Sequence, residues 1–237
     1  MTAHIEREVR RLDSVACVTG NSQPELLADI KELRTVFVEA MGWPCAEDGD
    51  HDIYDERGDT MHLMFRHGER LLAGMRLTPV STPEQSLSLE MMSNNQTMSD
   101  DVRRALAVMG NDCVFYDLTR LVALPELSSR DDVRLIKAGM AQMFGLGFEK
   151  TYYPQAPEKV RWIYATTTDM ARTLASMGIR QEVLAEGCVS DEDTQAHAKT
   201  LFCTTSPWEA YSGLCANPSR NETLRNVNIG LGQRYSL

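Results

Sequence analysis

The order in which strand-like and helix-like segments follow one another is the feature that most restricts the fold of this chain. Apolar and β-branched residues bounded by turn residues predict strands over residues 14–20, 60–65, 71–80, 113–124 and 161–168. Apolar residues at helical spacing predict helices over residues 21–43, 131–148 and 169–179, with a shorter helical piece around 102–108. This order predicts an α/β sandwich built on a mixed sheet.

The first expected helix has a clear start signal. Ser22 and Glu25 have the spacing of a capping box, and Pro24 falls in the first turn. Apolar residues then recur along one face: Leu26, Ile30, Leu33, Phe37 and Met41. We therefore expect this face to pack against the sheet.

Other boundaries are marked by turn and capping residues. Gly68 suits a hairpin turn between two strands, Asp169 is placed to cap the last expected helix, and Gly178 is placed to end it. The helix over residues 131–148 carries its own apolar face: Val133, Ile136, Met140 and Phe144. One more strand is expected within residues 191–215.

Length and composition indicate a single globular domain. The chain has 237 residues, 43% of them hydrophobic, which is enough to bury a sizeable core. We expect one domain over residues 1–205 and a C-terminal tail of unknown role over residues 206–237. No apolar run reaches the length of a signal peptide or a membrane span, so a cytoplasmic protein without a membrane span is expected.

Charge and motif content argue against several function classes. A net charge of −10 disfavours nucleic acid as a partner, because phosphate binding needs a concentrated cationic face. The six cysteines include no CxxC pair, the five histidines no HExxH pair, and the chain has no GxSxG elbow. A zinc ribbon, a metalloenzyme and a hydrolase are therefore not expected, and no metal site is predicted.

The stretch GDHDIYDERGD, residues 49–59, contains four aspartates. A solvated loop is the simplest interpretation. A calcium loop fits less well, because Ile53 and Asp59 stand where that pattern requires Gly and Glu. In an extended segment, Asp50 and Asp52 would share one face and would need cationic partners to remain ionised. The candidate partners are Arg34, Arg76 and Arg120.

Several of these segments, taken in order, resemble one protein family. The runs LRTVFVEAMGW, GDHDIYD, GMRLTP and YDLTRLVAL, followed by TTTDMARTLASMGIR, are similar to the ordered motifs of the acyl-homoserine-lactone synthases, the LuxI-type autoinducer synthases. The resemblance covers residues 14–190. It implies a GNAT-like three-layer α/β sandwich with a central mixed, mostly antiparallel sheet, which agrees with the element order above.

The chain departs from the family pattern at three places. Asp50 stands where the family usually has Glu, and Asp117 likewise replaces Glu in the motif ending at Arg120. Arg34 lies three residues before Phe37, where the family has four. These departures mark a divergent member and bear on the identity of the substrate.

The resemblance implies a specific reaction. Such enzymes join an acyl group from acyl carrier protein or coenzyme A to the amine of S-adenosylmethionine, close a lactone and release methylthioadenosine. No cofactor is required, because S-adenosylmethionine is a substrate. Carboxylates can stabilise its sulfonium and ammonium groups, an arginine can pair with its carboxylate, and a carboxylate can act as general base.

Roles for individual residues follow from the resemblance. Asp117 is the first candidate for the general base and Asp50 the second. The catalytic set is completed by Asp52, Arg76 and Arg120. Substrate binding is expected from Arg34, Phe37, Trp43 and Asp55. Two further residues fall where the family recognises the third carbon of the acyl chain: Thr166 and Thr167.

Each role has an ordinary structural alternative. Phe37 lies on the apolar stripe and would be a core residue in most proteins, and Trp43 could be a packing residue at the helix end. Arg76 and Arg120 could simply neutralise the acidic loop. Threonines are common strand residues in any case.

The segment after the fourth expected strand bears on the identity of the acyl donor. The segment LPELSSRDDVRLIKAG has no glycine before Gly139, which favours a carrier protein over coenzyme A, whose pyrophosphate needs a glycine-rich loop. Arg130, Arg134 and Lys137 share a helix face that could bind an acidic carrier protein or be simply solvated.

Two rival functions remain: a GNAT-type N-acyltransferase acting on a different amine, and a non-catalytic binding module.

Overall fold

The fold is built on one mixed sheet, seen in a computed structural model that describes residues 13–42, 49–50, 52–81, 85–90, 92, 95–109, 113–127, 129–152, 156–190 and 197–217. The seven strands lie in the order β1-β2-β3-β4-β5-β7-β6. Their bounds are Asp13–Thr19 (β1), Met61–His67 (β2), Arg70–Val80 (β3), Val114–Ala123 (β4), Val160–Thr167 (β5), Glu182–Ser190 (β6) and His197–Thr205 (β7). Neighbouring strands are antiparallel except β4 and β5, which run parallel. The expected mixed, mostly antiparallel sheet is confirmed.

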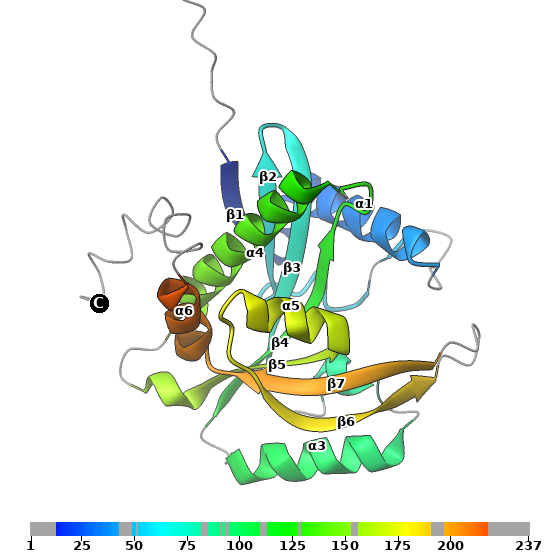
Figure 1. The fold of residues 1–237 in the computed structure, drawn as a ribbon, viewed down its shortest axis with the longest axis vertical. Helices are drawn as coiled ribbons and strands as arrows, with labels where there is room; N and C mark the ends of the chain where they lie inside the picture. Colours follow the sequence, from blue (N-terminus) through cyan, green and yellow to red (C-terminus); the bar gives the residue numbers. More distant parts are fainter. Residues whose placement is uncertain are drawn as a thin grey trace, which may run out of the picture.

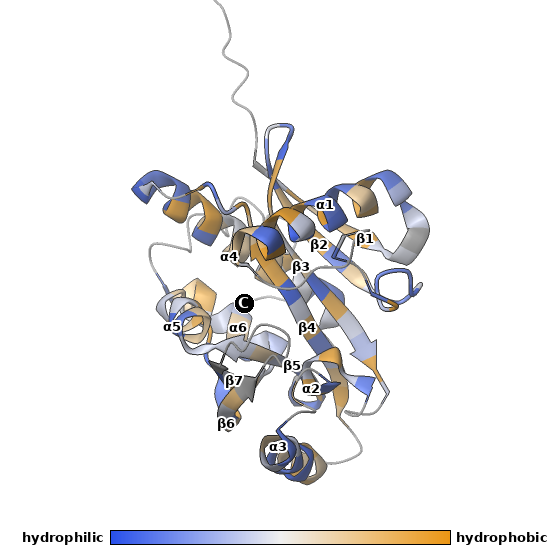
Figure 2. Ribbon diagram, turned by 90° about the vertical axis from the view of Figure 1, so that its right-hand side faces the viewer, coloured by the Kyte–Doolittle hydropathy of each residue, from blue (hydrophilic) through white to orange (hydrophobic). Residues whose placement is uncertain are grey.

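Helices cover both faces of this sheet and make three layers (Figures 1 and 2). One face carries α1 (Pro24–Ala40), α2 (Leu87–Glu90) and α3 (Gln96–Met109), whose apolar residues pack on Met64, Phe115 and Phe202. The other face carries α4 (Arg130–Thr151), α5 (Thr168–Ser176) and α6 (Pro207–Ala216), which share the largest core. Within the described ranges, none of these helices combines the length and apolarity needed to cross a membrane.

Helix α1 begins where expected but is capped differently. Residues Gly20–Ser22 form a 3-10 turn, so the N-cap is Gln23, which makes no side-chain capping bond. The predicted capping box of Ser22 and Glu25 is therefore wrong. The buried face is also rotated from the predicted stripe and includes the charged residue Arg34. The buried residues are Leu27, Ile30, Leu33, Arg34 and Val38. Phe37 is only half-buried and Met41 is exposed.

Other local predictions are confirmed or corrected in detail. Gly68 has φ +63 in the hairpin turn, and Gly178 has φ +99 just after α5, as the turn and helix-end signals predicted. The cap of α5 is Thr167, whose hydroxyl accepts from the N–H of Met170, and not Asp169. Strand β6 was not predicted. It lies at the edge of the sheet, and its sequence has only a short alternation of apolar and polar residues, with charged residues among them.

Strands β4 and β5 pair only at their beginnings. Their pairing runs from Val114 with Val160 to Asp117 with Ile163, although β4 continues to Ala123 and β5 to Thr167. Beyond Ile163, β5 keeps pairing with β7 on its other side. The two parallel strands therefore diverge toward their carboxyl ends (Figure 1).

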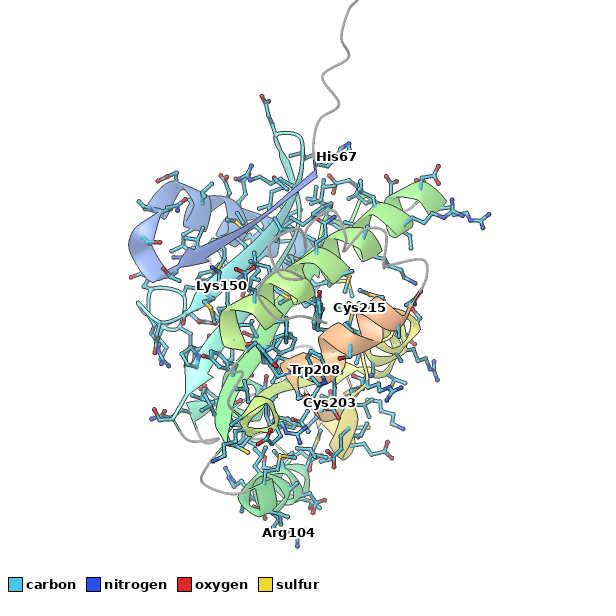
Figure 3. The ribbon with its side chains drawn as sticks, turned by 90° about the vertical axis from the view of Figure 1, so that its left-hand side faces the viewer. His67, Arg104, Lys150, Cys203, Trp208 and Cys215 are labelled. Carbon is cyan, nitrogen blue, oxygen red and sulfur yellow. The ribbon has the colours of Figure 1, made fainter. Side chains whose placement is uncertain are left out.

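Helix α6 occupies the start of the expected C-terminal tail. It lies beside α4, with Trp208 and Cys215 on it (Figure 3). The Trp208 ring lies 6.1 Å from Phe148, and the Tyr211 ring stacks on Phe148 at 4.4 Å. Residues 207–216 are thus packed on the sandwich. The rest of the expected tail, residues 218–237, lies outside the described residues.

A glycine pair fixes where α6 sits, and it can be tested. A Cβ placed on Gly213 would come within 1.8 Å of the carbonyl oxygen of Gly178. Gly213→Ala should therefore lower the free energy of unfolding by about 1–3 kcal/mol, or the melting temperature by several degrees, in thermal denaturation. Gly58→Ala is the control, because a Cβ there meets nothing within 4 Å. Equal stability of both variants would contradict this packing.

Candidate active site

Six charged side chains from four parts of the fold meet on the α1 face of the sheet. Helix α1 contributes Arg34, β3 contributes Arg76 and β4 contributes Arg120. The loop after α1 contributes three carboxylates: Asp50, Asp52 and Asp55. We call these six residues the ion-pair cluster. Figure 2 shows the hydrophilic stretches that interrupt the apolar strands β3 and β4 at this level.

The aspartate loop folds back on itself through its own side chains. The Asp52 carboxylate accepts from the N–H of Tyr54 at 2.9 Å, and its carbonyl accepts from the N–H of Asp55 at 3.1 Å. The Asp55 carboxylate in turn accepts from the N–H of Asp52 at 3.0 Å. Such side-chain to backbone bonds are why Asp favours tight turns. They aim both carboxylates at the sheet.

Arg34 forms the most deeply buried pair of the cluster. Its Nη1 and Nη2 donate to the two carboxylate oxygens of Asp55 at 2.6 and 3.0 Å. Its Nε donates to Asp50 Oδ2 at 3.0 Å, and Nη2 also donates to the Asp50 carbonyl at 2.6 Å. Arg34 is 1% exposed and Asp55 is fully buried. The planar guanidinium is suited to this two-pronged pairing.

Arg76 links the loop to strand β4. Its Nη1 donates to Asp52 at 2.6 Å and to Asp55 at 2.7 Å, and its Nε donates to the Thr119 hydroxyl at 3.0 Å. The Tyr54 ring lies 5.6 Å from its guanidinium carbon. Thr119 and Tyr54 were not singled out from the sequence, because their contacts depend on strand register and loop geometry.

Arg120 is the outermost arginine and has an unusual backbone. It pairs with Asp50 at 2.8 Å and with Asp52 at 3.1 Å, and 26% of its side chain is exposed. Its φ is +56, a left-handed conformation that is uncommon for a residue with a Cβ. The register between β3 and β4 shifts at this level, from Gly74 with Val122 to Arg76 with Thr119. Its buried Nε has no hydrogen-bond partner among the described residues.

The pairing determines the ionisation of the cluster. Burial by itself disfavours the charged carboxylate of Asp55, but the hydrogen bonds and charge of Arg34, with that of Arg76, outweigh it and hold the pKa of Asp55 far below its ordinary value. Burial likewise opposes ionisation of Asp52, and Arg76 still lowers its pKa. The expected Asp–Arg pairing is therefore confirmed, and each carboxylate has an arginine partner.

A buried histidine supports the loop from β2. His62 is fully buried, and its Nε2–H donates to the carbonyl of Asp55 at 3.0 Å, which leaves Nδ1 as a buried acceptor with no partner in the part of the chain that the structure describes. Burial lowers the pKa of His62, and the positive charges of Arg76 and Arg34 add to this. His62 is therefore neutral in the folded protein near neutral pH.

Asp117 lies on the same sheet face as the cluster but has other partners. It is 1% exposed beneath α2, where Ser88 donates to it from its hydroxyl at 2.5 Å and from its N–H at 3.1 Å. Burial raises the pKa of Asp117, although the Ser88 bonds oppose this. Ser88 was not found from the sequence, because it lies in a polar stretch without a strong pattern.

An apolar cavity of about 230 Å³ lies beside the carboxyl end of β4, among α1, α4 and α5. It is lined by Phe37 from α1 and by residues 121–124 of β4 and the segment after it. The opposite wall comes from α4 and α5: Val133, Ile136, Lys137, Met140, Met170 and Thr173. Phe37 lies one helical turn from Arg34, and Leu121 directly follows Arg120. The cavity therefore begins next to the ion-pair cluster.

The remaining predicted site residues are placed as follows. Thr166 is half-buried in β5 and Thr167 is exposed, and neither lines the cavity. Trp43 lies outside the described residues. Within the described ranges, no three His, Cys, Asp or Glu side chains come together as a metal site would require.

Comparison with known proteins shows a shared fold. Neither protein families nor curated proteins gave a sequence match. Among solved structures, TofI in a ternary complex with an inhibitor and MTA superposes with a TM-score of 0.56 at 17% identity, over 87% of this chain and 98% of that one. BjaI, a CoA-dependent acyl-homoserine lactone synthase solved with SAM and isopentyl-CoA, gives 0.54 at 20% identity, over 95% and 90%. The fold is one found in acyl-homoserine lactone synthases.

The same fold also serves other acylation chemistry. FeeM, an N-acyl amino acid synthase from uncultured soil microbes, superposes with a TM-score of 0.52 at 11% identity, over 86% of this chain and 97% of that one. At these identities the likeness establishes the GNAT-like sandwich, which confirms the expected fold class. A shared fold does not determine the function, which depends on the residues of the site.

The buried pairing can be tested with two neighbouring carboxylates. Asp55→Asn leaves Arg34 and Arg76 buried without their shared counter-charge, and should lower the free energy of unfolding by about 3–5 kcal/mol. Glu56→Gln removes only the exposed pair with Lys31 at 3.5 Å and should cost less than about 1 kcal/mol. Urea denaturation measures both. A small effect of Asp55→Asn would contradict the view that Asp55 is the anchor of the cluster.

The buried histidine predicts a pH dependence of stability. Because the folded pKa of His62 lies below its ordinary value of 6.5, the unfolded chain takes up the proton first. The contribution of His62 to the free energy of unfolding should not change with pH above about 6.5 and should fall below it, by up to about 1.4 kcal/mol per pH unit, until the folded pKa is passed. His62→Gln should remove this slope in urea titrations at several pH values. His67→Gln, at the exposed end of the same strand, should leave it in place.

Proposed function

We propose that this protein is an acyl-homoserine-lactone synthase of the LuxI type, which makes a quorum-sensing signal from S-adenosylmethionine and an acyl thioester. The observation that carries the proposal is the ion-pair cluster beside the apolar cavity. The residues of the cluster are those on which the sequence resemblance rests, and the fold is one that such synthases have. The charged acceptor would thus bind at the ion-pair cluster, and the apolar acyl chain would bind in the cavity.

The acceptor fits the outer edge of the cluster. An amino-acid head group carries a carboxylate and an ammonium group. Arg120 is the outermost arginine, and its 26% exposed side chain could pair with a bound carboxylate, while the partly exposed Asp52 and Asp50 could receive the cationic groups. The deeper pair of Arg34 and Asp55 would hold these outer residues in position.

The reaction needs two bond-forming steps. The amine nitrogen attacks the thioester carbonyl carbon, the carrier thiol leaves, and the amine proton passes to a base. The methionine carboxylate then attacks its own Cγ and methylthioadenosine leaves, a step that gains rate from proximity. Asp117 is our first candidate for the base, since its raised pKa suits proton uptake, and Asp50 is the second.

The acyl donor is proposed to be a thioester on acyl carrier protein. The start of α4, where coenzyme A users bind pyrophosphate, is closed by a capping box of Ser129 and Asp132, with Asp131 beside it. These carboxylates would repel a pyrophosphate. Gly139 is needed for packing, because a Cβ there would meet the Phe65 ring at 2.2 Å. BjaI is CoA-dependent, so both donors belong in the assay.

An N-acyltransferase acting on a different amine is the second candidate. In the cluster, three aspartates already pair with three arginines, so no carboxylate is left unpaired to receive a sulfonium. This charge balance favours the second candidate. FeeM, with the same fold, is an N-acyl amino acid synthase. Such an enzyme would form an acyl amide without releasing methylthioadenosine.

Product analysis tests the proposal. Protein incubated with S-adenosylmethionine and acyl thioesters on both carriers should yield methylthioadenosine and an acyl lactone by mass spectrometry. Asp52→Asn and Arg76→Ala should remove both products, whereas Glu56→Gln should keep them. An acyl amide without methylthioadenosine would support the second candidate instead.

Asp117→Asn separates chemistry from folding. It should lower the rate by about 10²–10⁴ if Asp117 is the base. Burial raises the pKa of Asp117, so the variant removes a carboxylate whose charged form burial disfavours, but it also leaves Ser88 with one acceptor oxygen instead of two. The melting temperature at pH 7 should therefore change by several degrees at most. An unchanged rate would exclude Asp117 as the base.

A further inference from the structure

Asp117, the first candidate for the base, is held by a residue of the short helix α2. We propose that Ser88 is a positioning residue for the acylation step: its hydroxyl and its N–H orient the Asp117 carboxylate and keep it unprotonated, ready to take the proton of the attacking amine. The inference rests on the proposed function, because it takes Asp117 as the base. It adds a residue outside the ion-pair cluster, from a segment without a recognisable sequence motif.

The two bonds from Ser88 engage both oxygens of the carboxylate. The Ser88 hydroxyl donates to Asp117 Oδ1 at 2.5 Å, and the Ser88 N–H donates to Oδ2 at 3.1 Å. An N–H group can only donate, so Oδ2 must accept, and 2.5 Å falls within the range of O–H···O⁻ bonds to an ionised oxygen. With one donor on each oxygen, the carboxylate cannot rotate freely. The geometry is therefore that of an ionised carboxylate with a fixed direction.

The position of Ser88 is set by the packing of α2 against β4 and β5 (Figure 2). Ser86 precedes this helix, and its hydroxyl accepts from the N–H of Leu89 at 3.2 Å. The Leu89 side chain is 3% exposed and belongs to the apolar core between α3 and the sheet. Ser88 lies between these two anchored residues and is itself 1% exposed. Its two donors are thus held against Asp117 inside the core.

Ser88 opposes the effect of burial on Asp117. The carboxylate is 1% exposed, and burial favours its neutral form, which cannot accept the amine proton. Burial accordingly raises the pKa of Asp117, and the Ser88 bonds act against this rise, followed by the Ser86 hydroxyl and the charge of Arg76. A base works best when its pKa lies near the working pH. Ser88 therefore lowers the pH above which Asp117 can act as the base.

Other ionisable groups also act near Asp117. Arg76, on β3, favours the ionised carboxylate through its charge, but its Nη1 donates to carboxylates of the ion-pair cluster. Burial raises the pKa of Tyr54, and the charges of Glu90 and Asp117 add to this, so the phenol stays protonated and uncharged near neutral pH. The exposed Glu90 is on α2, two residues after Ser88. Ser88 is the residue that contacts both carboxylate oxygens.

Carbon-13 NMR of the Asp117 carboxyl group tests the inference without turnover. In protein labelled at the aspartate carboxyl carbons, the Asp117 signal is the one missing from Asp117→Asn. Ser88→Ala should raise the midpoint of its pH titration by about one pH unit, because a hydrogen bond to the charged form is lost. Ser88→Cys should raise it less, because a thiol is a weaker donor than a hydroxyl.

Ser99→Ala is the matched control for these variants. Ser99 is also 1% exposed, on the neighbouring helix α3, but its hydroxyl donates to the carbonyl of Met92 at 2.9 Å. The control removes a buried, hydrogen-bonded hydroxyl and should leave the Asp117 titration unchanged. Equal midpoints in the parent, Ser88→Cys and Ser88→Ala, or an equal rise in Ser99→Ala, would overturn the inference.

The pH dependence of acyl transfer is the second readout. With the thiol released from the acyl thioester as the measured product, the acid limb of kcat/KM should move to higher pH in Ser88→Ala, and most of the lost rate should return at alkaline pH. Combined with Asp117→Asn, Ser88→Ala should lower the rate no further, because Ser88 acts through Asp117. A loss that is the same at every pH, or a further loss in the double variant, would indicate a purely structural role and overturn the inference.

The outcomes separate this inference from the proposed function. Thiol release reports the attack of the amine, which the synthase and the N-acyltransferase share, whereas methylthioadenosine reports only the synthase. Shifts of the titration and of the acid limb without methylthioadenosine would overturn the synthase proposal and leave Ser88 in its role. Release of methylthioadenosine, with neither shift in Ser88→Ala, would overturn the inference and leave the synthase proposal intact.

Discussion

The buried pairing of Arg34 with Asp55 is the interaction on which the rest of the site depends. A guanidinium that is 1% exposed is unfavourable unless a carboxylate matches it, and Asp55 does so with both oxygens. This pair ties α1 to the loop that follows it. Arg76 then joins the same carboxylate to β3 and, through Thr119, to β4. Three elements far apart in sequence are thereby held in one geometry.

The shape of β4 connects the charged half of the site to the apolar half. The left-handed backbone at Arg120 coincides with the register shift between β3 and β4. Just before it, β4 has stopped pairing with β5 at Asp117, and just after it, residues 121–124 line the cavity. Backbone strain of this kind persists only where its surroundings hold it, and here the Asp50 and Asp52 carboxylates bind the Arg120 guanidinium.

Sequence reasoning reached the parts of this structure that depend on local pattern and charge balance. Strand and helix periodicity predicted the sandwich, and the need to neutralise buried aspartates predicted the partners Arg34, Arg76 and Arg120. It failed where the geometry depends on contacts between segments that are far apart in the sequence. The 3-10 turn that displaces the cap of α1, the Ser88 bonds to Asp117 and the edge strand β6 have no strong local signal. The cavity could not be predicted, because its lining comes from α1, β4, α4 and α5, which meet only in the folded chain.

The charge balance of the cluster restricts which acceptors can bind beside it. Three arginines and three aspartates leave no net charge, so a simple cation would find every carboxylate already paired. A zwitterionic head group is different, because its carboxylate can pair with the partly exposed Arg120 side chain while its ammonium group shares an outer aspartate, and neither end is left uncompensated. An α-amino acid is such a group, and S-adenosylmethionine carries one. We therefore propose an amino-acid acceptor over a plain amine, whichever of the two proposed reactions follows.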